Sequence, residues 1–230
     1  MLYVTGDMHG DYERFASSKF KKLKKDDVLF ICGDFGFIWD GSKKENKLLK
    51  KICNQKYTVC FVDGTHENFE LLKEYETVDF HGSKAQHIGG NLYHLLRGQI
   101  YDFDGKKVFT MGGGESPDID LRSTDGEWSY DEIPTQNELM EGVNNLKKYK
   151  NKIDIVITHE PPTKLKGFLK LQDKEPVRVT SLNTYFEELG KACEFKHWYF
   201  GSMHIDKFIS SSYVAVFQNL FNAEDGTPVK

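Results

Sequence analysis

The chain has 230 residues, of which 39% are hydrophobic and 29% charged, and its formal net charge is −4. This length suffices for one well-buried core, and no linker-like stretch interrupts it, so we expect a single domain over residues 1–230. The basic residues are scattered, which argues against a duplex nucleic-acid partner. Because no apolar run approaches the roughly 18 residues of a membrane span and the cysteines form no CxxC pair, we expect a cytoplasmic protein without a membrane partner.

Short apolar runs recur along the chain and indicate buried strands. They lie at residues 2–6, 28–33, 59–64, 153–158 and 198–201. Between the first three runs lie helical patterns, one with an apolar stripe from Tyr12 to Leu23 and one around Leu48 to Cys53. Alternation of strand and helix predicts a parallel or mixed sheet.

Two further helix starts are marked by capping-box spacing. Ser42 stands three residues before Glu45, and Thr135 stands three residues before Glu138. In such a box the first side chain accepts a hydrogen bond from the backbone of the third helical residue, whose own side chain bonds back. We therefore expect helices to begin close to these two positions.

The remaining stretches indicate strands and loops. Residues 91–111 have strand character, with a hairpin turn at Asp104-Gly105, and residues 204–220 are again strand-like. The two prolines at 161–162 forbid a normal helix start directly after the fourth apolar run. Residues 112–134 show no periodicity and predict a surface loop over the site.

Potential metal ligands follow the apolar runs. They are Asp7, His9, Asp34, His66, His159 and His204. Asp7 and His9 are two positions apart, so on an extended backbone both side chains point the same way and can hold one ion. Each residue alone also has a structural explanation, such as a turn aspartate or a surface histidine. Carboxylate and imidazole without cysteine suit divalent manganese, iron, zinc or nickel, and paired ions of this kind commonly split phosphate esters.

The order and spacing of these segments resemble the calcineurin-like metallophosphoesterase superfamily, whose blocks run D-x-H, G-D, G-N-H-E/D, H and G-H-x-H. The corresponding segments are Asp7-Met8-His9, Gly33-Asp34, Gly64-Thr65-His66-Glu67, His159 and Gly201-Ser202-Met203-His204. The resemblance spans nearly the whole chain. Segments such as Leu96-Arg97-Gly98-Gln99 further resemble a bacterial and phage phosphoesterase branch of this superfamily.

The resemblance implies an α/β fold, a calcineurin-like four-layer α/β/β/α sandwich of two mixed sheets flanked by helices. It also implies a pair of divalent metal ions, which we expect to be Mn²⁺, with iron, zinc or nickel as alternatives. Asp7, His9 and His204 would ligate the first ion, and Asp34 would bridge it to the second. His159 would be a ligand of the second ion.

Two positions depart from the family pattern, and both belong to the second ion. Thr65 stands where the family has asparagine, and Ser202 stands where it has histidine. A neutral hydroxyl is a poorer ligand than an imidazole, and the threonine oxygen lies one bond nearer the backbone than an asparagine carbonyl oxygen. We therefore expect one tight ion and one weak ion. The groups that could complete the coordination of the second ion, besides water, are Glu67 and Glu160.

The function that follows is hydrolysis of a phosphomonoester or phosphodiester by metal-activated water, with His66 as the proton donor to the leaving group. The first alternative is a degenerate family member that binds a phosphorylated ligand or a protein partner without turnover. A second alternative is an unrelated α/β binding domain in which the motifs are accidental.

The substrate is less constrained by the sequence. Arg97 and Arg122 could clamp phosphate oxygens, because arginine forms bidentate pairs with them, but each could equally form an ion pair with a carboxylate. We expect a small phosphoester or a phosphopeptide. The choice between monoester and diester, and the oligomeric state, stay open.

Overall fold

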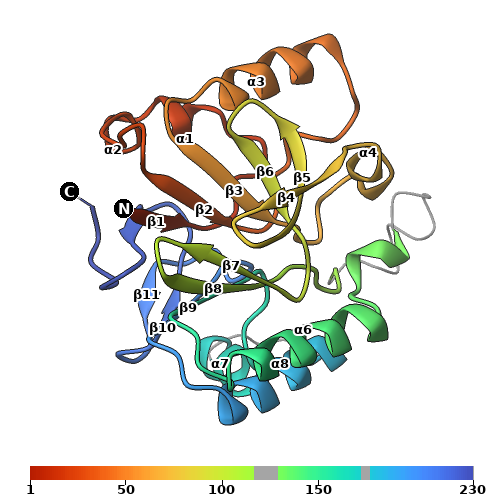
Figure 1. The fold of residues 1–230 in the computed structure, drawn as a ribbon, viewed down its shortest axis with the longest axis vertical. Coiled ribbons are helices and arrows are strands. Elements are labelled where there is room, and N and C mark those ends of the chain that lie inside the picture. Colours follow the sequence, from red (N-terminus) through yellow and green to blue (C-terminus); the bar gives the residue numbers. More distant parts are fainter. Residues whose placement is uncertain (117–128, 172–176, 230) are drawn as a thin grey trace.

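The structure is a computed structural model that describes residues 1–116, 129–171 and 177–229. Two β-sheets face each other, and helices cover both outer faces (Figure 1). The predicted α/β/β/α sandwich of two mixed sheets is therefore confirmed. None of the helices among these residues is long and apolar enough to cross a membrane.

The first sheet has seven strands in the order β13-β1-β2-β3-β6-β5-β4. Their bounds are Leu2–Thr5 (β1), Val28–Cys32 (β2), Thr58–Val62 (β3), Thr77–Phe80 (β4), Ser83–Gly89 (β5), Leu92–Leu95 (β6) and Phe221–Asn222 (β13). Strands β1, β2, β3 and β6 run parallel, which confirms the prediction from strand and helix alternation. The outer face of this sheet is covered by α1 (Glu13–Ala16), α2 (Ser18–Lys21), α3 (Lys43–Cys53) and α4 (Phe69–Lys73).

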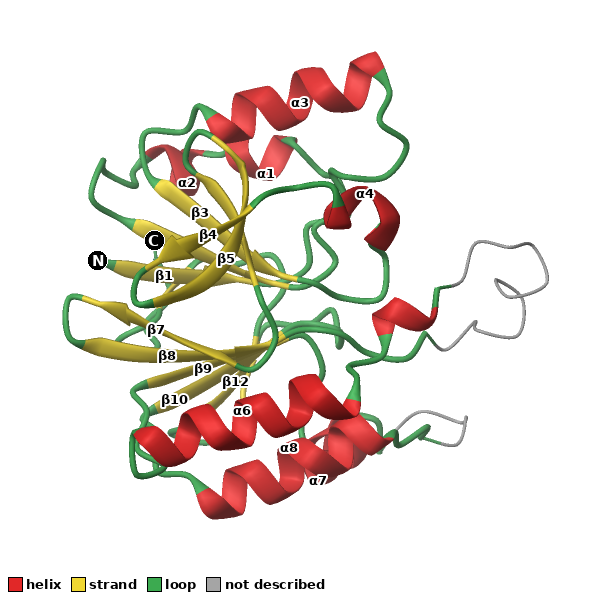
Figure 2. Cartoon of the chain, turned by 45° about the vertical axis from the view of Figure 1, so that its right-hand side comes forward, coloured by secondary structure: helices red, strands yellow, loops and turns green. Residues whose placement is uncertain are grey.

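The second sheet has six strands in the order β11-β12-β10-β9-β8-β7. Their bounds are Gln99–Phe103 (β7), Lys106–Met111 (β8), Ile155–Thr158 (β9), His197–Phe200 (β10), Lys207–Phe208 (β11) and Tyr213–Ala215 (β12). Its helices are α6 (Gln136–Lys148), α7 (Thr163–Leu169) and α8 (Ser181–Ala192), which lie on the lower face in Figure 2. A short 3-10 helix, η1 (Tyr130–Glu132), precedes α6.

The apolar runs are continuous because both faces of the central strands are buried. In β2, Phe30 packs into the core between the two sheets, whereas Leu29 and Ile31 pack under the helices of the first sheet. Side chains of a strand alternate between its faces, so a strand with two buried faces shows no polar alternation. The first sheet is thereby fixed between two apolar layers.

Some predicted elements differ in detail. The stripe from Tyr12 to Leu23 forms two short helices, because the extended backbone at Ser17 (φ −66°, ψ 158°) separates α1 from α2. Ser42 caps α3 as predicted, but the carboxylate of Glu45 bonds to the backbone NH groups of residues 39–41 rather than to Ser42. At Thr135 the full capping box is present.

The prolines at 161–162 do not prevent a helix. Helix α7 begins at Thr163, with Pro162 as its N-cap residue, directly after the two prolines that were expected to forbid a normal helix start. Proline is tolerated there because the first NH groups of a helix have no partner within it. The sequence reading also missed α8, although Thr180 and Asn183 form its capping box.

Candidate functional site

The candidate site lies at one edge of the sandwich, where parallel strands of both sheets end (Figure 2). Asp7, Asp34 and His66 lie in the loops after β1, β2 and β3 of the first sheet. His159 and His204 lie in the loops after β9 and β10 of the second sheet. Carboxyl ends of parallel strands form a common edge where loop side chains can converge.

Four of the predicted ligands converge on one point. Each of Asp7, His9, Asp34 and His204 offers a ligand atom, and these atoms all lie within 4.8 Å of one another. Nε2 of His204 lies 3.0 Å from Nε2 of His9 and 3.0 Å from Oδ2 of Asp7. Two nitrogens that each lie about 2.1 Å from one ion, at a right angle, are about 3.0 Å apart, so this spacing suits a shared cation.

The buried carboxylate of Asp7 supports the same fit. Its Oδ2 is inaccessible to solvent and receives no hydrogen bond of acceptable geometry from the described part of the chain. A buried carboxylate oxygen without a donor is costly unless a positive charge satisfies it. The residues therefore fit a divalent cation at this point, with oxygen and nitrogen ligands of the kind that manganese, iron or zinc accept.

His159 lies beside this cluster rather than within it. Its Nδ1 is 3.0 Å from the carbonyl oxygen of Cys32, and because a carbonyl accepts only, Nδ1 carries the hydrogen. The other ring nitrogen, Nε2, lies 3.6 Å from Oδ1 of Asp34. Metal-ligating histidines usually donate their second nitrogen to a backbone carbonyl or carboxylate. The geometry thus suits a second ligand position shared by His159 and Asp34.

The two replaced positions offer hydroxyl groups near this second position. Oγ1 of Thr65 lies 3.0 Å from Nδ1 of His66, and the backbone NH of Thr65 donates to Asp34. Oγ of Ser202 is buried without a hydrogen-bond partner in the described part of the chain, and its backbone NH donates to Oδ1 of Asp7. Both backbones thus position a carboxylate of the site.

Both carboxylates that could complete the coordination of the second ion form hydrogen bonds within the protein. Glu67 accepts hydrogen bonds from the backbone NH groups of Phe35 (2.6 Å) and Gly36 (3.4 Å). Burial and the charge of Asp34 raise the pKa of Glu67 well above its ordinary value. Glu160 accepts from Nζ of Lys166 at 2.7 Å, and a neighbouring amide donates to the same oxygen. Both glutamates therefore fix loops of the site.

The charges of the site are strongly coupled. Burial alone would raise the pKa of Asp34, but the charge of His159 and hydrogen bonds from His66 outweigh it, so the pKa stays far below its ordinary value. Burial would lower the pKa of His159, but the carboxylates of Asp34 and Asp7 raise it well above its ordinary value. The carboxylate of Asp7, whose Oδ2 lies 3.0 Å from Nε2 of His204, likewise raises the pKa of His204. The carboxylates of Asp7 and Asp34 thus favour the protonated forms of His159 and His204 in the metal-free site.

Backbone strain is concentrated at the site. Four of its residues have left-handed backbones, namely His9 (φ 46°), Asp34 (φ 41°), Ser202 (φ 43°) and His204 (φ 50°). Such conformations are uncommon outside glycine and cost of order 1–3 kcal/mol each. The surrounding hydrogen bonds, such as those from the NH groups of Met8 and His9 to the carbonyl of Asp34, maintain them.

Glycines in the motifs leave room for the ligands. A side chain at Gly64 would collide with the carboxylate of Asp34, and one at Gly201 would collide with the carboxylate of Asp7 and the carbonyl of Cys32. Gly64, in the motif of His66, therefore makes space for Asp34. Gly201, in the motif of His204, makes space for Asp7. This explains the glycines at the ends of β3 and β10.

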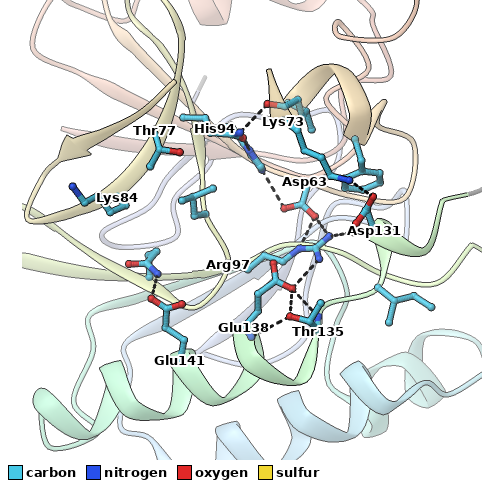
Figure 3. A pocket seen from close by; sticks show the side chains of 16 residues that line it. Asp63, Lys73, Thr77, Lys84, His94, Arg97, Asp131, Thr135, Glu138 and Glu141 are labelled. Atoms are coloured by element: carbon cyan, nitrogen blue, oxygen red, sulfur yellow. Dashed lines mark hydrogen bonds and ion pairs between the residues drawn. The ribbon is translucent and has the colours of Figure 1, made fainter. Parts of the chain in front are cut away.

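Arg97 does not point at the cluster. It is buried, and its guanidinium donates to Oδ2 of Asp63 through Nε (2.9 Å) and Nη2 (2.5 Å). It also contacts Glu138, and Nε2 of His94 lies 3.1 Å from the other oxygen of Asp63. These groups meet at a pocket of about 440 Å³ between the sheet edges (Figure 3). Arg97 thus matches the ion-pair alternative, while Arg122 lies outside the described residues.

Two residues at the site carried no signal in the sequence. Arg14 donates to the carbonyl oxygens of Asp7 and Phe217 and to Oγ1 of Thr5. The ring of Phe217 stacks on His204, with ring centres 5.0 Å apart. Phe217 comes from the segment after β12, so its contact with His204 depends on the return of the chain rather than on a motif. Together these residues connect the loops that carry Asp7 and His204.

Comparison with known proteins identifies the family of the chain. A family model described as calcineurin-like phosphoesterase matches residues 1–209. No curated protein matches the chain. Among solved structures, a phosphopantetheinyl hydrolase (PptH) from Mycobacterium tuberculosis is similar, with 14% identity, a TM-score of 0.40, and coverage of 94% of this chain and 89% of that chain. A TM-score this low supports no inference about function.

Proposed function

The chain belongs to the calcineurin-like phosphoesterase family, and on that premise we propose that it hydrolyses small phosphoesters with the help of bound divalent metal ions. The observation that carries this proposal is the convergence of Asp7, His9, Asp34 and His204 from loops of both sheets. A cluster of this composition, beside the partly exposed histidine His66, is suited to ester hydrolysis rather than to structural support.

We assign the first ion to Asp7, His9, Asp34 and His204. The second would be held by Asp34 and His159 with fewer protein ligands, because Thr65 and Ser202 replace the expected asparagine and histidine. The second ion should therefore bind more weakly than the first, and we propose manganese for both. When bound, such ions lower the pKa of water and stabilise charge on phosphoryl oxygens.

His66 completes the reaction in this proposal. Water forms a bond to phosphorus and loses a proton to solvent, while the bond from phosphorus to the ester oxygen breaks. The departing oxygen takes the proton from Nε2 of His66, so the products are an alcohol and a phosphate. The His66 side chain is 43% exposed, and its Nδ1 lies 3.1 Å from Oδ2 of Asp34. It can therefore reach a substrate while Asp34 orients it.

A small phosphoester or phosphopeptide suits the acidic chain better than a long polyanion does. The four cysteines are all free, which fits a reducing compartment such as the cytoplasm. The faster of p-nitrophenyl phosphate and bis-p-nitrophenyl phosphate decides between a monoester and a diester preference.

A second candidate function is binding of a phosphorylated ligand without turnover. Thr65 and Ser202 favour it, because they remove two ligands of the second ion. Loss of two ligands should weaken that site at least as much as the 10–100-fold that neighbouring contacts alone typically contribute. Under this alternative the first ion still binds, but no ester bond is broken.

The experiment is a comparison of initial rates on p-nitrophenyl phosphate and bis-p-nitrophenyl phosphate with added manganese. The variant is Asp34→Asn, which keeps an oxygen that can accept the NH groups of Thr65 and His66. The matched control is Asp79→Asn, because the Asp79 side chain is 89% exposed on β4. We expect hydrolysis that Asp34→Asn abolishes and Asp79→Asn preserves. Bound manganese without hydrolysis in the native protein would instead establish the binding function.

A further inference from the structure

Thr65 occupies the position where the family pattern has a metal-ligating asparagine, yet its hydroxyl lies 3.0 Å from Nδ1 of His66. We propose that Thr65 is a positioning residue for His66 and does not ligate the second ion. It holds the imidazole through Nδ1, so that Nε2 faces the leaving group. This inference rests on the proposed function, in which His66 donates a proton.

The backbone of Thr65 is fixed first. Thr65 is 5% exposed, and its NH donates to Oδ1 of Asp34 at 2.7 Å. The NH of His66 donates to the same oxygen at 2.9 Å. One carboxylate oxygen therefore fixes the backbone of the turn that carries both residues. The positions of the two side chains then depend only on their own χ angles.

The side chain of Thr65 is then fixed by its methyl group. Cγ2 packs against Gly114 so closely that a Cβ at position 114 would lie 2.7 Å from it. Threonine is branched at Cβ, so one χ1 angle places both the methyl and the hydroxyl. With the methyl against Gly114, the hydroxyl lies beside His66. Valine has the same shape and would keep the packing while removing the hydroxyl.

Two oxygen atoms lie close to Nδ1 of the His66 ring. Nδ1 lies 3.0 Å from Oγ1 of Thr65 and 3.1 Å from Oδ2 of Asp34. An ionised carboxylate only accepts, so Nδ1 carries a hydrogen that the two oxygens share. Both contacts are made through Nδ1, so they orient the ring without occupying Nε2.

Thr65 gives Nδ1 of His66 a hydrogen-bond partner that does not also bind the metal ions. Asp34 is the carboxylate proposed to lie between the two ions, and a carboxylate that binds cations has less negative charge left for a neighbouring hydrogen. The hydroxyl of Thr65 is neutral and a weak metal ligand, so it stays available to Nδ1. Replacement of asparagine by threonine thus exchanges a metal ligand for a second anchor of His66.

The first test detects the hydrogen bond between Thr65 and His66 and does not depend on hydrolysis. Nitrogen-15 NMR of the histidine rings in the metal-free protein compares the native chain with Thr65→Val and Thr65→Ser, and His66→Ala assigns the signal. The matched control is Thr77→Val, at an exposed threonine of β4. We expect Thr65→Val alone to move the Nδ1 resonance of His66. An unmoved resonance overturns the proposal.

The second test uses leaving groups. Phenyl phosphate needs a proton on its leaving oxygen more than p-nitrophenyl phosphate does. We expect Thr65→Val to lower the ratio of kcat on phenyl phosphate to kcat on p-nitrophenyl phosphate about tenfold, part of the roughly 100-fold or more that a general acid contributes. Thr65→Ser should restore the ratio. In a His66→Ala background, Thr65→Val should change the ratio no further.

Manganese titration separates positioning from ligation. If Thr65 positions His66, the affinity for both ions is the same in Thr65→Val and in the native protein. If Thr65→Val instead binds the second ion more weakly, and loses equal activity on both substrates until excess manganese restores it, Thr65 is a ligand and the proposal is overturned.

If the native protein hydrolyses neither substrate, the proposed function fails and the role of Thr65 in proton transfer fails with it. The NMR result still decides whether the hydrogen bond exists.

Discussion

The Nε2 atoms of His9 and His204 lie 3.0 Å apart, although 195 residues separate them along the chain. His9 follows a strand of the first sheet, and His204 follows a strand of the second. The cluster therefore exists only when the two sheets pack against each other. Metal binding should accordingly report on the packing of the whole sandwich and not on one loop.

Gly201→Ala should disrupt the cluster. A methyl group there collides with the carboxylate of Asp7 and the carbonyl of Cys32, so one of them must move. Overpacking of this kind typically costs about 1–3 kcal/mol, and we expect the tight manganese site to be lost as well. Calorimetric manganese titration and urea unfolding measure both effects.

The matched control is Gly167→Ala in α7, where the added methyl group meets no atom. This change should stabilise the fold by up to about 1 kcal/mol. Equal manganese affinity in both variants would contradict the geometry.

Ser202→His should strengthen the second ion. Position 202 has a left-handed backbone (φ 43°), which histidine tolerates better than most residues, and its side chain lies in the family's position for a ligand of the second ion. We expect at least about tenfold tighter binding of the second manganese, by analogy with the effect of neighbouring contacts on metal sites. Ser202→Ala is the control, because it removes the hydroxyl without adding an imidazole. No gain relative to Ser202→Ala would mean that position 202 does not face the second ion.

Arg97→Met should destabilise the fold. The guanidinium neutralises the buried carboxylate of Asp63, and with His94 it holds the pKa of Asp63 far below its ordinary value in spite of burial. Loss of one partner leaves an uncompensated buried charge, which costs about 3–5 kcal/mol. Urea unfolding should show this loss, whereas Lys84→Met, at an exposed pair with Asp79, should cost less than about 1 kcal/mol. Comparable losses in the two variants would refute the buried pair as a stabilising contact.

Manganese affinity should rise with pH. The carboxylates of Asp34 and Asp7 raise the pKa of His159, and the carboxylate of Asp7 raises that of His204, above the ordinary value of 6.5. An ion binds the neutral imidazole, so below these raised values a proton must leave first. The affinity should therefore fall as pH decreases toward 6.5, by up to about tenfold per pH unit for each proton displaced. Calorimetry in two buffers of different ionisation enthalpy counts the protons. Affinity that does not change with pH would contradict protonated histidines in the metal-free site.

The sequence predicted the parts of the fold that depend on local patterns. The buried strands were found because both of their faces are apolar, and α6 was found because Thr135 and Glu138 form its capping box. Helix α8 and the hairpin of β4 and β5 were missed. The helix has the same kind of cap at Thr180 and Asn183, but its N3 residue is asparagine rather than glutamate, so the expected signature was absent.

The site was predictable where a motif fixes a residue, and not where tertiary packing does. Parallel strand order placed Asp7 and Asp34 at one edge of the first sheet, whereas His204, which follows a strand of the second sheet, was assigned by the family motif. No local pattern, however, indicates that Phe217 stacks on His204 or that Glu67 binds the backbone of the Asp34 loop. Those contacts join segments that are distant in sequence, so they depend on how the two sheets and their loops pack.

The most direct measurement is a titration of the metal-free protein with manganese, in which bound ions per chain and initial rates on p-nitrophenyl phosphate are recorded at the same free concentrations. We expect one tight ion, a second ion that binds at higher manganese concentration, and hydrolysis that rises as the second ion binds. Two ions of equal affinity, or two bound ions without any hydrolysis, would contradict this expectation.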